Sequence, residues 1–168
     1  ARFDDLVTAA VARRHRSGVI AHRTEPDLKN GVGGLRDAQL VSALSMAHLS
    51  DGRPVVPGAM ASAHRLVLDA RTELHRVSGR GREVLHAEYG DEVARALGLG
   101  DRFDLARALS DASRTIAFTA DQAIRASCAS LSSRGLTGLL RRSPIRRPLD
   151  DGVVEHSGEV ALARNARV

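Results

Sequence analysis

Apolar residues recur at helical spacing through most of this chain. Stretches over 2–15, 35–50, 58–78, 82–97 and 102–131 each place Leu, Val, Ile, Met, Phe or Ala three or four positions apart. Short segments rich in Gly, Pro or Ser separate them, as expected of loops. Five helices of this length with short connections predict a helical bundle.

The last part of the chain has a different pattern. Residues 132–148 have no sustained apolar period, which indicates an irregular segment. In "GVVEHSGEVALA", two short apolar runs flank Ser157 and Gly158, which predicts a β-hairpin. We therefore predict a mostly α fold, with a bundle of about five helices over 1–131 and a short C-terminal β-hairpin within 132–168. A lone hairpin is marginal in water, so it must pack on the bundle or on a neighbouring domain that is missing here.

The composition excludes several kinds of site and of protein. The single cysteine, Cys128, excludes an internal disulfide and a Cys-based zinc site. No apolar run approaches the length of about 18 residues that a membrane helix needs, and no signal peptide is visible. We therefore expect a soluble, cytoplasmic protein with no membrane partner.

The net charge of +5 raises the question of nucleic-acid binding. Of the 25 basic residues, however, Lys29 is the only lysine, a bias typical of a GC-rich genome. Twenty carboxylates are interspersed among the arginines, and the one basic cluster, over 141–147, has no aromatic neighbours for base stacking. Binding to nucleic acid is therefore the weaker interpretation.

Known catalytic layouts are missing from the sequence. It has no P-loop lysine motif, no G-x-S-x-G elbow, no H-E-x-x-H pair and no His-Asp doublet. It also has no Asp-x-Asp pair that could hold Mg²⁺ for phosphoryl or nucleotidyl transfer. We predict no catalytic residue and no metal site in this chain alone.

The stretch "EPDLKNGVGGLRD", residues 25–37, is the candidate site. Its pattern predicts an extended segment, a glycine turn and then the start of a helix, whose free N–H groups favour an anion. Lys29 and Arg36 flank that point and could bind a phosphate or a partner's carboxylate. The same pattern also suits a solvent-exposed turn without a ligand, and spacing alone does not decide between the two.

Further residues of the stretch complete this candidate site. The glycines permit positive φ and close approach of the backbone to a ligand. The carboxylates have a supporting role, in which they orient the cations or reach a ligand. The glycines are Gly31, Gly33 and Gly34, and the carboxylates are Glu25, Asp27 and Asp37.

"EPDLKNGVGGLRDAQL" resembles the E-P-(N/D)-x-K-x-G-x-G-G-L-R-D signature of the PII-protein uridylyltransferase/uridylyl-removing enzymes. "RTELHRVSGRGREVL" and "LDDGVVEHSGEVAL" resemble later segments of that family. The resemblance implies the helical domain between a nucleotidyltransferase domain and an HD phosphohydrolase domain, which paired ACT domains follow. The arginine-rich composition resembles actinobacterial members.

This resemblance implies a function in nitrogen regulation. The full-length enzyme would transfer UMP or AMP from UTP or ATP, with Mg²⁺, to a tyrosine of the PII signalling protein. The present chain would contribute a phosphate- or partner-binding loop, would hold no cofactor and would be inactive alone. The alternative is a non-catalytic spacer or a bundle that docks PII.

Overall fold

The computed structural model describes residues 3–47, 57–134, 147–150, 153–156 and 159–162. The chain divides into two compact units, residues 1–128 and 129–168. The division that the sequence predicts, after residue 131, stays a prediction. Most of the basic cluster over 141–147 lies outside the described residues.

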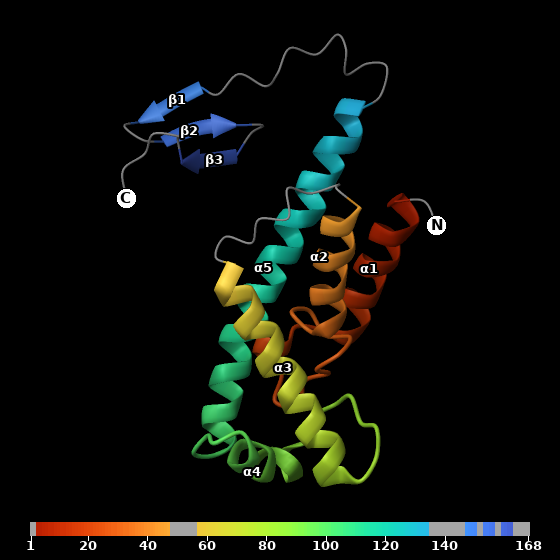
Figure 1. The fold of residues 1–168 in the computed structure, drawn as a ribbon, viewed down its shortest axis with the longest axis vertical. Coiled ribbons are helices and arrows are strands. Elements are labelled where there is room, and N and C mark those ends of the chain that lie inside the picture. Colours follow the sequence, from red (N-terminus) through yellow and green to blue (C-terminus); the bar gives the residue numbers. More distant parts are fainter. Residues whose placement is uncertain (1–2, 48–56, 135–146, 151–152, 157–158, 163–168) are drawn as a thin grey trace. The chain divides into compact units, whose positions relative to one another are not determined.

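The first unit is helical (Figure 1). Its elements are α1 (Phe3–Ser17), the 3-10 helix η1 (Ile20–His22), α2 (Leu35–Met46), α3 (Pro57–Ser78), α4 (Ala87–Ala96) and α5 (Arg102–Arg134), which continues past the unit boundary. The prediction of a mostly α fold with five α-helices is confirmed. None of the described helices has the length and apolarity that crossing a membrane requires.

One predicted helix begins later than expected. The sequence predicted a helix over 82–97, but α4 begins at Ala87 and the residues before it are extended. The Leu28 N–H donates to the Glu83 carbonyl at 2.8 Å, and the Leu85 N–H donates to the Pro26 carbonyl at 3.0 Å. Pairing with the distant segment 26–28 thus replaces the helical hydrogen bonds of 82–86.

Most of the core lies between α2, α3, α4 and α5. Its buried members are Leu28, Leu35, Ala38, Ala63, Val67, Ala70, Leu74, Leu85, Val93, Ala94, Leu105, Leu109, Ala112 and Ile116. A second cluster joins α1, α2 and α5 through Ala10, Leu40, Leu44 and Ala123. Leu28 is fully buried although it belongs to the candidate loop, so the loop is part of the main core.

The turn between α4 and α5 follows the sequence signals. Gly98 has φ 72°, and its N–H donates to Arg95 while the Leu99 N–H donates to Ala94, which together form a Schellman motif. The Asp101 side chain then accepts from the N–H groups of Phe103 and Asp104 at 2.8 and 3.0 Å and caps α5. The segment "GLGD", residues 98–101, thus ends α4 and caps α5.

In the second unit three short strands are described, β1 (Arg147–Asp150), β2 (Val153–His156) and β3 (Glu159–Leu162). They pair antiparallel in the order β1-β2-β3, and Val154 lies opposite Ala161. The expected turn residues, Ser157 and Gly158, lie outside the described part of the chain. The sequence did not predict β1, which begins inside the segment expected to be irregular.

Candidate functional site

The candidate loop, residues 23–34, is fixed to the fold along both of its edges. Val32 forms a parallel bridge with Val19, and Asp27 forms an antiparallel bridge with Val84. Leu28 inserts into the core between these two bridges. The loop is therefore a packed element whose backbone position is set by its neighbours, and a solvent-exposed turn does not describe it.

Asp27 organises the tightest part of the loop. Its Oδ1 accepts from the N–H groups of Lys29 and Asn30 at 3.0 and 2.7 Å, and its Oδ2 accepts from the Asn30 side-chain amide at 3.0 Å. A side chain that binds its own backbone two and three residues on forms an Asx turn. Asp27 therefore holds Lys29 in place through the backbone.

The glycines of the loop make close contacts within the protein. Gly33 has φ 82°, and a Cβ at this position would lie 2.2 Å from the Ser113 carbonyl oxygen of α5. A Cβ at Gly34 would meet the Leu28 carbonyl oxygen at 2.8 Å, and one at Gly31 would meet that of Asp27 at 2.6 Å. All three glycines are buried, and each permits the loop to fold tightly on itself or on α5.

The first turn of α2 is already hydrogen-bonded. The N–H groups of Leu35 and Arg36 donate to the carbonyls of Leu28 and Lys29 at 3.1 and 3.0 Å, and the Asp37 N–H donates to Gly34 at 3.0 Å. The expectation that this helix start offers free N–H groups to an anion is therefore wrong. The loop folds back so that its own carbonyls occupy these donors, and any anion here would have to be bound by side chains.

Asp37 is a fully buried carboxylate at the centre of an ion cluster. Its side chain accepts from the Gly33 N–H at 2.9 Å, from Arg14 Nε at 3.1 and 3.2 Å, and from Arg13. Arg14 also donates to Asp121 of α5 at 2.5 Å. Because buried charges are stable only when paired, this cluster ties the loop and α2 to α1 and α5.

The two arginines of this cluster differ in their surroundings. Burial acts to lower the pKa of Arg14, but its hydrogen bonds to Asp37 and Asp121 outweigh burial and raise that pKa. Burial lowers the pKa of Arg13 despite the attraction of Asp37, and the nearby charges of Arg14 and Arg36 act in the same direction. Arg14 and Arg36 therefore lie close enough to Arg13 to repel its charge.

Lys29 forms an ion pair that the sequence did not predict. Its Nζ donates to the Glu83 Oε1 at 3.1 Å, and Arg71 of α3 donates to both Glu83 oxygens at 2.5 and 2.7 Å. The Arg71 hydrogen bond, with that of Lys29, lowers the pKa of Glu83 to about 2. Both partners lie in the segment "RTELHRVSGRGREVL", so the second motif was the available signal. The Lys29 side chain remains 36% exposed, so part of it is accessible to a ligand.

The remaining candidate residues lie near the surface. Arg36 is exposed, and its backbone is bonded to that of Lys29, which places the two residues side by side. Glu25 accepts from the Ala87 N–H at 3.2 Å and contacts the His86 Nδ1 at 3.1 Å. It therefore caps the N-terminus of α4, although it lies far from that helix in the sequence. The Ala87 N–H and then His86 lower the pKa of Glu25.

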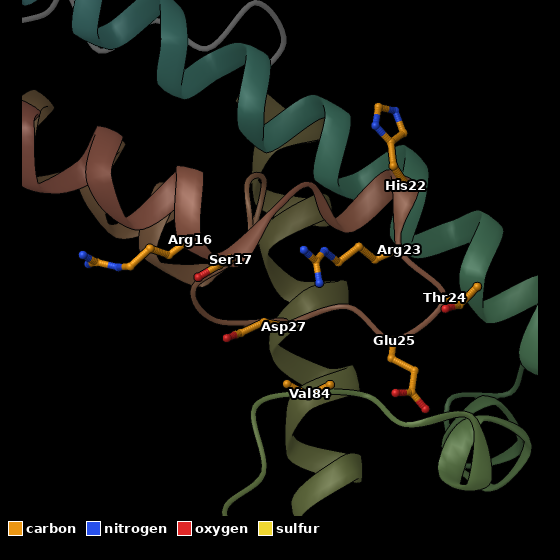
Figure 2. A pocket seen from close by; sticks show the side chains of 8 residues that line it. All are labelled: Arg16, Ser17, His22, Arg23, Thr24, Glu25, Asp27 and Val84. Carbon is orange, nitrogen blue, oxygen red and sulfur yellow. The ribbon is translucent and has the colours of Figure 1, made fainter.

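A polar hollow of about 620 Å³ borders the start of the loop (Figure 2). Arg16 and Ser17 come from the end of α1, residues 22–25 and Asp27 form another wall, and Val84 lies beside Asp27. The full set is Arg16, Ser17, His22, Arg23, Thr24, Glu25, Asp27 and Val84. Its walls carry both basic and acidic groups. Within the part of the chain that the structure describes, no group of three or more His, Cys, Asp or Glu side chains could hold a metal ion.

Comparison with known proteins gives a consistent result. A family model described as GlnD PII-uridylyltransferase matches residues 1–124. A bifunctional uridylyltransferase/uridylyl-removing enzyme of Mycobacterium tuberculosis is 54% identical over an alignment of 170 positions, which covers 98% of this chain. Enzymes with the same name from Corynebacterium glutamicum and Streptomyces coelicolor are 41% and 36% identical over 96% and 99% of the chain.

The match covers a limited part of these relatives. The chain spans about a fifth of their length, 21% of the Mycobacterium tuberculosis enzyme and 22% of the Corynebacterium glutamicum enzyme. No solved structure gives a significant match to the chain. The relatives come from actinobacteria, as the arginine-rich composition predicted.

Proposed function

Because the chain belongs to the PII-uridylyltransferase family, we propose that it is the helical region of a nucleotidyltransferase that modifies the PII signalling protein. The full-length enzyme would act in the cytoplasm and transfer UMP or AMP from UTP or ATP with Mg²⁺. The uridylyl group in the names of its relatives favours UTP. The metal-binding carboxylates would come from a nucleotidyltransferase domain outside this chain, and the HD and ACT domains would also lie elsewhere in the protein.

The observation that carries this proposal is the construction of the loop that bears Lys29 and of the start of α2 that bears Arg36. The Asx turn at Asp27, the bridges to Val19 and Val84 and the buried Asp37 cluster all fix its backbone. Arg36 is exposed and Lys29 is 36% exposed, so both cations can face a neighbouring domain. Preorganised cations of this kind stabilise the negative charge that develops on phosphate groups during transfer.

We assign separate roles within this loop. Lys29 and Arg36 would bind the triphosphate or an acidic group of the partner. The buried glycines and Asp27 would keep the turn compact, while Glu25 and Asp37 would anchor the two ends of the loop on α4 and α1. Because the first-turn N–H groups of α2 are occupied, charge on the side chains would supply the binding energy.

The main alternative is a structural loop within a docking or spacer bundle. The Lys29–Glu83 ion pair favours it, since a paired ammonium can stabilise the fold without touching a ligand. In that case PII would bind to the bundle without any nucleotide effect on residues 25–37. Titration of this chain with PII and with each nucleotide, followed by amide chemical shifts, separates the two interpretations.

Mutation of the full-length enzyme tests the assignment directly. Lys29→Ala should lower the rate of nucleotidyl transfer by about 100-fold or more, the effect of losing one preorganised electrostatic donor. Arg76→Ala is the matched control, because Arg76 is an exposed cation of α3 that pairs only with Glu73 among the described contacts. Near-normal turnover of the Lys29 variant would refute the assignment. A parallel loss of activity and melting temperature would support the structural alternative.

A further inference from the structure

A second hollow adjoins the polar one, with which it shares the lining residues Arg23 and Thr24. It has a volume of about 330 Å³ and is formed by η1, the residues around His86, and the first two turns of α5. We call it the α4–α5 groove. Its lining residues are Ile20, Ala21, Arg23, Thr24, Pro26, Leu85, His86, Ala87, Gly90, Arg102, Phe103, Leu105, Ala106 and Leu109. This volume lies at the lower end of the range for binding pockets, about 300 Å³, and suits one or two large side chains.

The floor of the α4–α5 groove is apolar. Ile20, Leu85, Leu105 and Leu109 are all less than a tenth exposed, so they are already fixed in the core. Gly90 permits the close approach of α4 to α5, because a Cβ there would meet the Arg102 Cβ at 2.8 Å. The floor is thus a preformed surface, and an apolar group that enters it would lose water without rearranging the fold.

The rim of the groove carries positive charge at Arg102, and no carboxylate is among the lining residues. Arg23 also lines the groove, but its guanidinium lies against Gly18, on the side of the polar hollow (Figure 2). Arg102 keeps a loose surface ion pair with Asp91, with 3.9 Å between Nε and Oδ2, and the His86 Nδ1 contacts Glu25, which is not a lining residue. An occupant would therefore be recognised by an apolar group with negative charge beside it.

Phe103 marks the edge of the groove as a contact surface. Its ring is 66% exposed and stacks with the Arg102 guanidinium, whose carbon lies 5.4 Å from the ring centre. Aromatic residues and arginines are the side chains most enriched among the energetically important residues of protein interfaces. Thr24 is the only one of these lining residues with an uncharged hydroxyl or amide side chain. The groove therefore has too few polar groups for specific recognition of a small metabolite.

We propose that the α4–α5 groove binds an acidic peptide segment of a partner protein, with one bulky apolar side chain on the leucine floor and a carboxylate beside Arg102. The occupant is defined by charge complementarity and groove size. The proposal concerns protein recognition and does not depend on the nucleotide chemistry proposed above.

The test uses the 168-residue chain and a defined probe. The probe is a blocked, fluorescent peptide with one phenylalanine between two pairs of glutamates, and its binding is followed by anisotropy. Two control peptides replace the phenylalanine with alanine or the glutamates with lysines. We expect the acidic phenylalanine peptide to bind at least about tenfold more tightly than either control, the size of effect expected when an interface anchor is lost.

Matched variants locate the binding. Phe103→Ala should weaken binding about tenfold, whereas Phe118→Ala should not, because Phe118 is an exposed phenylalanine of the same helix outside the groove. Arg102→Gln should weaken binding about threefold and flatten its salt dependence. Arg107→Gln, on the same helix but outside the groove, should leave binding unchanged. Unchanged far-UV circular dichroism shows that the variants remain folded.

Three results would overturn the proposal. The first is the absence of peptide binding, and the second is equal loss of binding in the Phe103 and Phe118 variants. The third is equally tight binding of N-acetyl-phenylalanine amide, which would point to a small ligand. Methyl chemical shifts give an independent readout, because the peptide should shift signals of Leu85, Leu105 and Leu109. Shifts confined to other leucines would contradict the location.

Discussion

The ammonium of Lys29 donates a hydrogen bond to the Glu83 carboxylate at 3.1 Å, across 54 positions of the sequence. The same carboxylate receives two hydrogen bonds from Arg71. The only lysine of the chain thus links the candidate loop to α3 and to the segment before α4. Substitutions at this contact change the unfolding free energy, which can be measured without any ligand and therefore separately from a binding role.

Replacement of Glu83 by glutamine should destabilise the fold in a pH-dependent way. The pKa of Glu83 is lowered from its ordinary 4.5 to about 2, chiefly by the Arg71 hydrogen bond. Because the lowered pKa belongs to the folded state, the carboxylate contributes its full stability above about pH 4.5 and loses it as the pH falls toward 2. We expect Glu83→Gln to lower the free energy of unfolding by about 1 to 3 kcal/mol at pH 7. Urea unfolding at several pH values should show this difference shrinking below pH 4.5.

Glu73→Gln is the control for this measurement. Glu73 is as exposed as Glu83, at 24%, but its partner among the described contacts is Arg76, one turn along the same helix. Its loss should change the unfolding free energy by about 0.5 kcal/mol or less. An equal effect of the two substitutions would mean that the Lys29–Glu83–Arg71 network adds nothing to stability.

Gly33→Ala should be among the more disruptive single-methyl changes in the chain. Its positive φ disfavours a side chain, and the added Cβ would overlap the Ser113 carbonyl of α5. We expect a loss of about 3 kcal/mol or more, from backbone strain together with overpacking. Gly98→Ala separates backbone strain from overpacking. Gly98 also has a positive φ, 72°, but nothing lies within 4 Å of its added Cβ. That control should cost about 1 kcal/mol in urea unfolding, and equal losses would exclude the contact with Ser113 as a cause.

Asp37→Asn should show how much the buried ion cluster contributes to the free energy of unfolding. Asparagine keeps the shape and the acceptor for the Gly33 N–H, but it leaves Arg13 and Arg14 without their buried counter-charge. We expect a loss of about 3 kcal/mol, as for other broken buried ion pairs. Asp121→Asn removes the charge of the other carboxylate that pairs with Arg14, at a site that is 46% exposed, and it should cost about 1 kcal/mol or less. Comparable values from thermal unfolding would show that burial of Asp37 is unimportant.

The helices could be predicted from the sequence because their apolar period is a local property. The turn at Gly98 and Asp101 could be predicted for the same reason, since the cap and the helix end lie within a few residues. The start of α4 could not be predicted. Residues 82–86 carry an apolar pattern compatible with a helix, but hydrogen bonds to Pro26 and Leu28 decide their conformation.

The same distinction applies to the candidate site. Composition singled out Lys29, and the motif singled out the glycines and carboxylates around it. The partners of these residues could not be seen in the sequence, because Glu83, Arg13 and Ser113 are brought to the loop only by the packing of α1, α5 and the segment before α4. The occupied N–H groups of α2 were missed for a related reason, since a helix start in sequence does not reveal that the preceding loop folds back over it.

Lys29→Arg should separate the structural role of this residue from its proposed role in transfer. An arginine can still pair with Glu83, so the unfolding free energy of the chain should stay within about 1 kcal/mol of the unchanged protein. A planar guanidinium does not reproduce the compact ammonium, so the rate of nucleotidyl transfer by the full-length enzyme should fall by at least about tenfold. Arg76→Lys is the control, because it exchanges the same two cations at an exposed site of α3 and should change neither quantity. A Lys29→Arg enzyme with normal stability and normal transfer would show that any cation suffices at this position, both for the ion pair with Glu83 and for transfer.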